Sequence, residues 1–230
     1  MGSRYSGLVL SYIYICTHTL ITECVKNPDT GERMYTEELN SANWWHRNAE
    51  TLPELCKILA LILYADATHL TSSGSQVAHP ILLSLGNLCS RVRNKDRGMV
   101  MIGMLPILRA SRAVRETEGF SEFKLSLHHQ CWDILLKEVR EAAVLGGIYI
   151  RVMGETLYVF PMIPFIQQDN QEGAAMCGVK LGHEVLLPCR MCWITKADCN
   201  NPRVVAERRT EVQMKKHVKK YQRRYDLFCM

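Results

Sequence analysis

The stretch "LILYADATHLTSSGSQVAHPILLSLGNL", from Leu61 to Leu88, decides the fold of this chain. An apolar run with the composition of a buried β-strand, 57–65, ends at a single carboxylate, Asp66. A polar loop follows, and a second apolar run comes at 81–88. A third run of the same kind spans 98–108. Because consecutive strands joined by short loops are typical of an antiparallel meander, we expect these three runs to pair in chain order.

A helix and a strand pair follow the meander. Apolar side chains recur at three- and four-residue steps over 121–147, and Gly146 with Gly147 ends the pattern. The next segment predicts two strands around Gly154. A chain that returns through a helix brings its next strand beside the first strand. The sequence therefore predicts an α/β fold with a mixed sheet and flanking helices.

The bulk composition fits a globular protein rather than a disordered one. The chain has 230 residues, of which 47% are hydrophobic, and its mean hydropathy is -0.08. The apolar segment "GLVLSYIYICTHTLI" near the N-terminus is too short and too polar for a bilayer span or a secretory signal. We therefore expect no membrane partner. With ten cysteines spread along the chain, we also expect a reducing compartment in which most thiols are free.

Positive charge is concentrated near the C-terminus. Nine Lys or Arg residues lie between Arg203 and Arg224, against the two acids Glu207 and Glu211. Such a segment is typical either of a polyanion-binding surface or of a solvated basic helix, and composition alone does not separate the two. The candidate phosphate-contacting residues are Lys215, Lys216, Lys219, Lys220, Arg223 and Arg224.

Asp66 has a second acid as a candidate partner. Asp169 lies just past the strand pair that follows the helix, and in a mixed sheet two strand-end acids can come close together. Close carboxylates repel each other unless a cation neutralises them, and oxygen ligands favour Mg²⁺ or Mn²⁺. An isolated strand-end aspartate is more often a cap or a turn former. The spacing by itself leaves both interpretations open.

Five blocks, taken in order, carry a resemblance to a known family. Between about Gly31 and Arg209 the chain resembles the Plavaka-type transposases of fungal genomes, which are similar to the CACTA group of cut-and-paste elements. The family's pattern around its first acid, Asp-Lys-Thr-(His/Gln)-Leu-Thr, is matched by "DATHLT" from Asp66 to Thr71. The blocks are "GERMYTEELNSANWW", "LILYADATHLTSSGSQVAHPILLSLGNL", "IGMLPI", "VFPMIPFIQQDNQE" and "CRMCW".

The resemblance implies an RNase H-like fold with an Asp-Asp-Glu triad that binds Mg²⁺ or Mn²⁺ for DNA cleavage and strand transfer. Asp66 matches the first acid and Asp169 the second, with His69 and Glu172 in the catalytic neighbourhood. It also implies DNA as the partner, a nuclear location and no small-molecule cofactor. From it we expect a helical lead-in over 1–50, the transposase core over 51–185, and a Cys-x-x-Cys segment with a basic tail over 186–230.

Two departures from the family pattern bear on activity. Val152-Met153-Gly154 replaces the family's Ala-Asp-Gly, and the segment that would carry the third acid falls after Met230. We therefore expect a fold incomplete at the C-terminus and a truncated or inactive transposase derivative. The alternative is a non-catalytic basic DNA- or protein-binding module derived from a transposon.

The Cys-x-x-Cys pair is a candidate zinc half-site. Cys189 and Cys192 have the spacing of two ligands in a tetrahedral Zn²⁺ site, Cys199 is a candidate third ligand, and His183 or His217 a fourth. The resemblance adds weight, since the family has a Cys-Pro-x-Cys pair at this place. Free thiols on a tight turn and a redox pair are the alternatives.

Overall fold

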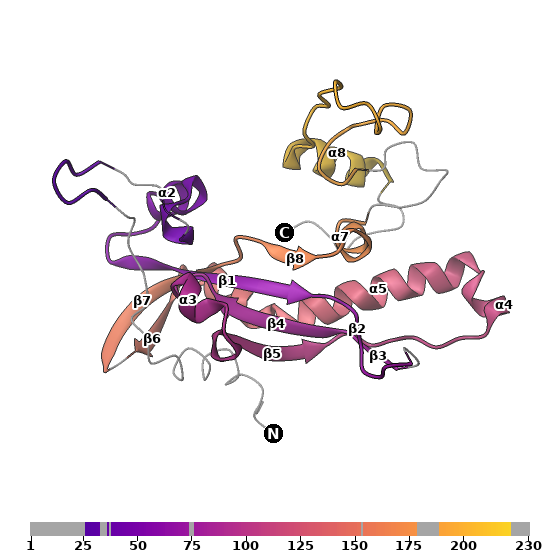
Figure 1. Ribbon diagram of the computed structural model, residues 1–230, viewed down its shortest axis with the longest axis horizontal. Helices are drawn as coiled ribbons and strands as arrows, with labels where there is room; N and C mark the ends of the chain where they lie inside the picture. Colours follow the sequence, from indigo (N-terminus) through magenta and orange to yellow (C-terminus); the bar gives the residue numbers. More distant parts are fainter. Residues whose placement is uncertain are drawn as a thin grey trace. The chain divides into compact units, whose positions relative to one another are not determined.

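The computed structural model describes residues 26–32, 36, 38–73, 76–152, 154–178 and 189–221, and divides the chain into two compact units, Met1–Gln168 and Asp169–Met230 (Figure 1). The apolar segment near the N-terminus, Met153, His183 and the pair Arg223 and Arg224 lie outside the described residues. The domain boundaries expected after residues 50 and 185 stay predictions.

The first unit is built on a six-stranded mixed sheet in which β1 is central. The strand order is β5-β4-β1-β7-β6, and β8 also pairs with β1. A separate two-stranded sheet joins β2 and β3. The strands are β1 (Cys56–Ala65), β2 (Thr68–His69), β3 (Val77–Ala78), β4 (Pro80–Leu85), β5 (Met99–Met104), β6 (Ile148–Val152), β7 (Glu155–Met162) and β8 (Ile166–Gln168).

The helices of the first unit precede and connect these strands. Figure 1 shows the long helix α5 behind the sheet, after the meander and before β6. No helix within the described ranges is long and apolar enough to cross a membrane. The helices are η1 (Leu39–Ser41), α2 (Asn43–Ala49), α3 (Ser90–Arg93), η2 (Asp96–Gly98), α4 (Arg112–Arg115), α5 (Glu118–Leu135) and α6 (Lys137–Val144).

The pairing confirms the expected meander. β1 pairs antiparallel with β4, and β4 pairs antiparallel with β5. On its other side β1 runs parallel to β7 over its first half and parallel to β8 over its last residues. The strand that directly follows the helices, β6, does not lie beside β1 as we expected. It forms an antiparallel hairpin with β7 and occupies the sheet edge, because β7 takes the place next to β1.

The helix expected over 121–147 is two helices. Leu136 leaves helical geometry with ψ near 5°, so α5 ends at Leu135 and α6 begins at Lys137. The predicted glycine stop is confirmed, because Gly146 and Gly147 take φ values of 80° and 134° that other residues rarely adopt. The mixed sheet with its flanking helices is consistent with an RNase H-like α/β fold.

The core surrounds β1, which is buried along nearly its whole length. The Trp45 side chain is 0% exposed and packs with Ile58 and Ala60, so α2 closes this end of the core. Asn87, also buried, accepts a hydrogen bond from the Ala60 N–H at 2.8 Å and donates one to the Ile58 carbonyl at 2.8 Å. This side chain thus extends the hydrogen bonding of β1 past the point where β4 ends.

Candidate functional site

Two predicted acids follow the paired ends of two parallel strands. The last pair between β1 and β8 joins Ala65 to Gln168, and the next residues along the chain are Asp66 and Asp169. Ala65 is 0% exposed whereas Asp66 is exposed, so the carboxylate stands directly where a buried strand ends. Asp66 belongs to the first unit, and Asp169 is the first residue of the second.

Asp169 has a structural task in the second unit. It is the N-cap of α7 (Asn170–Met176), and its Oδ1 accepts a hydrogen bond from the Glu172 N–H at 2.7 Å. This interaction satisfies one of the amides that a helix start leaves unpaired. The cap also fixes the side-chain direction of Asp169, while Glu172 lies half-buried in the first turn.

His69 lies on the short hairpin after Asp66. It is exposed and pairs with Val77 across β2 and β3. Within the described ranges, no three His, Cys, Asp or Glu side chains are grouped closely enough to hold a metal ion. The catalytic and metal-binding roles of Asp66, Asp169, His69 and Glu172 stay predictions.

The cysteine pair forms a tight turn, the cysteine knuckle (Cys189–Cys192). The Met191 N–H donates to the Cys189 Sγ at 3.3 Å. The backbone of Cys192 forms an isolated antiparallel β-bridge with that of Arg208. Burial alone would raise the pKa of the Cys189 thiol, but hydrogen bonds from Met191 and Cys192 and the charge of Arg209 outweigh burial and lower that pKa. A lowered pKa favours the thiolate, which is the form that binds metals and attacks electrophiles.

Cys199, the third predicted zinc ligand, is exposed. Its thiol donates to the Lys196 carbonyl at 3.1 Å. His217 lies in α8 (Glu211–Tyr221), and its side chain is outside the described part of the chain. The zinc site stays a prediction.

A tryptophan and an arginine attach the knuckle to α8. The Arg209 guanidinium lies 4.3 Å from the centre of the Trp193 ring, within the range of a cation–π interaction. Arg209 also donates from Nε to the Cys192 carbonyl at 3.0 Å, and the Trp193 indole N–H donates to Gln213 of α8 at 3.2 Å. Sequence reasoning missed these contacts, since only the block "CRMCW" placed the tryptophan next to the cysteines.

A comparison with protein families identifies the chain. A family model described as Plavaka transposase matches residues 18–229. The chain belongs to the Plavaka transposase family. This confirms the family suggested by the five blocks and supports a transposase-like function, for which DNA is the general substrate. Neither the curated proteins nor the solved structures compared with this Plavaka chain include a match.

The basic segment of this Plavaka chain includes a helix, α8. Four of the predicted phosphate-contacting lysines lie on it as two pairs about one turn apart: Lys215, Lys216, Lys219 and Lys220. Lys215 forms an ion pair with Glu211 at 2.5 Å, and Lys216 is exposed. The side chains of Lys219 and Lys220 lie outside the part of the chain that the structure describes. Phosphate binding by this helix stays a prediction.

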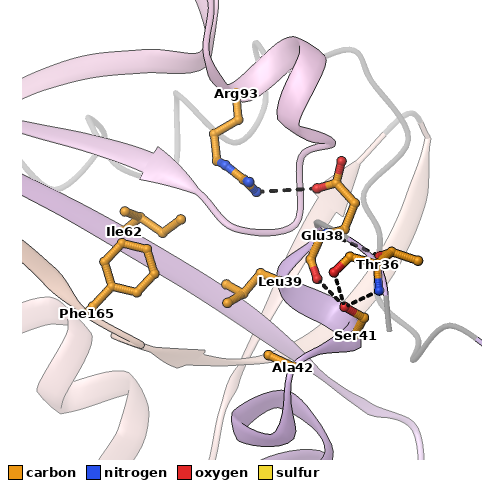
Figure 2. Close-up of a pocket in the computed structure, with 8 residues that line it drawn as sticks. All are labelled: Thr36, Glu38, Leu39, Ser41, Ala42, Ile62, Arg93 and Phe165. Atoms are coloured by element: carbon orange, nitrogen blue, oxygen red, sulfur yellow. Dashed lines mark hydrogen bonds and ion pairs between the residues drawn. The ribbon is translucent and has the colours of Figure 1, made fainter. Parts of the chain in front are cut away.

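A pocket of about 360 Å³ opens elsewhere on the first unit of the Plavaka chain. Figure 2 shows the Glu38 carboxylate turned toward the Arg93 guanidinium across it, at 3.7 Å. Glu38 also accepts from the Ser90 N–H at 2.7 Å, and Arg93 donates to the Leu88 carbonyl at 3.0 Å. These contacts hold the segment before η1 against the turn after β4. The pocket is lined by Thr36, Glu38, Leu39, Ser41, Ala42, Ile62, Arg93 and Phe165.

Proposed function

We propose that this Plavaka chain carries a transposase site in which Asp66 and Asp169 bind a divalent cation, Mg²⁺ or Mn²⁺. The observation that carries the proposal is the parallel pairing of β1 with β8. Its last pair is Ala65 with Gln168, and an aspartate follows each of them. Parallel strands leave a sheet at the same edge, so Ala65 and Gln168, the residues that precede the two acids, lie side by side there.

The donor chemistry of the two acids fits such a cation. Asp66 is an exposed carboxylate, and the cap of α7 occupies only Oδ1 of Asp169. Oxygen ligands from carboxylates are those that Mg²⁺ and Mn²⁺ prefer, and a small number of them suffices when water and phosphate complete the coordination. When bound, the cation would activate a water or a 3′-hydroxyl and stabilise the leaving oxygen of a phosphodiester.

The chain's own residues supply position and rigidity. Asp66 is attached to a strand that is hydrogen-bonded on both sides, and Asp169 is held by its cap to the Glu172 amide. The Asp169 side chain, held by this hydrogen bond, loses little further freedom on binding a ligand. We further propose that His69, exposed three residues after Asp66, contacts a substrate phosphate.

Manganese binding tests this proposal. Purified Asp66→Asn and Asp169→Asn proteins are titrated with Mn²⁺ by electron paramagnetic resonance beside the unsubstituted chain and an Asp29→Asn control in an exposed turn. We expect each site variant to bind Mn²⁺ at least about tenfold more weakly, because metal affinity falls by that much even when an outer-shell partner is lost. Unchanged affinity in either site variant would refute the proposal.

The second candidate function is non-catalytic DNA binding by a transposon-derived module. The lysines of α8 favour it, because each Lys–phosphate contact releases counterions and makes binding salt-dependent. A variant with Lys215, Lys216, Lys219 and Lys220 changed to Gln is predicted to elute earlier from DNA-cellulose in a salt gradient. Retention on DNA without any metal-dependent nicking would favour this candidate over the enzyme. A nuclear location is expected under either proposal.

A further inference from the structure

The cysteine knuckle reaches the helix that Asp169 caps. Arg190, the second residue of the knuckle, donates from Nη1 to the carbonyl oxygens of Asp169 and Asn170, both at 3.3 Å. These contacts join residues that are 21 and 20 positions apart, and both lie within the second unit. The guanidinium is thus bound to the backbone of Asp169 itself and of the first residue of α7.

Gly173 makes room for this arrangement. A Cβ atom at position 173 would collide with the Arg190 guanidinium, and Gly173 is buried beneath it. The hydrogen bonds and this close packing are independent contacts from the same side chain. Together they fix the guanidinium against the first turn of α7.

The other end of the knuckle is also fixed. Cys192 accepts from Arg209 Nε through its carbonyl, and the Arg209 N–H donates to the Met191 carbonyl at 2.9 Å. The Met191 N–H in turn donates to the Cys189 Sγ. Arg190 therefore projects from a turn whose backbone is restrained on both sides, which is the condition for a side chain to position a neighbouring element.

We propose that Arg190 is a positioning residue for Asp169, and that the cysteine knuckle thereby sets the divalent-cation affinity of the second acid. The inference rests on the proposed function, since it concerns the acid that we assign to the metal. Arg190 acts through the backbone carbonyls of Asp169 and Asn170 rather than through the Asp169 carboxylate. Loss of its two hydrogen bonds frees the start of α7 and widens the range of positions that Asp169 samples.

The test compares Arg190→Gln with Arg203→Gln, an exposed arginine of the same unit that serves as the matched control. Two quantities are measured on each full-length protein: the Mn²⁺ dissociation constant, and the deuterium uptake of the peptide spanning residues 169–176. A Gly173→Ala variant is measured beside them, because it displaces the guanidinium without removing it.

We expect Arg190→Gln and Gly173→Ala to weaken Mn²⁺ binding by about tenfold, the lower end of the loss seen for outer-shell partners. We also expect them to speed deuterium uptake in 169–176, with Arg203→Gln changing neither quantity. A merely structural role would change the exchange but leave Mn²⁺ affinity intact, and that result overturns the inference.

The failure of the inference is distinguishable from the failure of the proposed function. If Asp169→Asn weakens Mn²⁺ binding while Arg190→Gln does not, the metal assignment stands and the positioning role is wrong. If Asp169→Asn leaves Mn²⁺ binding unchanged, both are wrong.

Discussion

The buried side chain of Asn87 is predicted to stabilise β1 by completing its backbone hydrogen bonding. This side chain accepts from the Ala60 N–H and donates to the Ile58 carbonyl, each at 2.8 Å, and it is 1% exposed. β4 pairs with β1 only from Leu61 onward, so Asn87 takes the place of a strand partner for the residues before it. Substitution by alanine leaves both backbone groups buried and unpaired.

The cost follows from the two groups left unpaired. A buried polar group that loses its partner costs about 1–3 kcal/mol, so with two such groups Asn87→Ala is predicted to lower the free energy of unfolding by about 2–6 kcal/mol. Urea unfolding followed by circular dichroism measures this loss. Asn94→Ala, at an exposed asparagine after α3, is the matched control and is expected to change stability by less than about 0.5 kcal/mol. A loss under about 1 kcal/mol for Asn87→Ala would refute the reasoning.

Two further predictions concern packing and pH. Gly86→Ala adds a methyl group that would overlap side chains of η1 and β1, so it is predicted to cost about 1–3 kcal/mol in the same unfolding assay. Burial, with the nearby charges of His129 and His79, lowers the pKa of His128 from 6.5 to about 4. Because the unfolded chain then binds this proton more readily, the stability contributed by neutral His128 is complete above about pH 6.5 and is lost as pH falls toward about 4. His128→Gln is predicted to reduce the drop in urea midpoint between about pH 7.5 and about pH 5, whereas His69→Gln, at an exposed histidine, leaves that drop unchanged.

The strands were predictable where burial dictates composition. The apolar runs that became β1, β4 and β5 are bounded by polar loops, and strands that follow one another along the chain commonly pair with each other. The edge position of β6 was not predictable, because a hairpin of two apolar strands can present either strand to β1. The break at Leu136 carries no glycine or proline, and the apolar spacing continues across it, so nothing local in the sequence indicated it.

In the candidate site, too, some residues were predictable from the sequence and the contacts that hold them were not. Asp66 could be singled out because its carboxylate directly follows an apolar run, and Asp169 because it lies just past the predicted strand pair and matches the family's second acid. The contacts that hold Asp169 could not, because Arg190 lies 21 residues away with only the fold to bring the two together. Asn87 is a similar case, since "GN" in a sequence indicates a turn and says nothing of a side chain that bonds a strand 27 residues earlier.

The burial of the two neighbouring histidines on α5, His128 and His129, was not predictable from the sequence either. Neighbouring residues on a helix point in different directions, so helix periodicity allows at most one of His128 and His129 to face the core. His129 is 3% exposed, and His128 is half-buried with its Nε2 accepting from the Trp132 indole N–H at 3.1 Å. The periodicity of the helix does not predict how deeply His128 is buried or that its side chain bonds the Trp132 indole.

Under the proposed function Asp66 and Asp169 bind one cation together, and a double-mutant cycle on Mn²⁺ affinity separates a shared ion from two independent contributions. The dissociation constant is measured for the unsubstituted chain, Asp66→Asn, Asp169→Asn and the double variant. If the two acids share an ion, the double variant is predicted to bind only slightly more weakly than the weaker single variant, because the first substitution already removes the shared site. Single losses that simply add, or no loss at all, would contradict the claim.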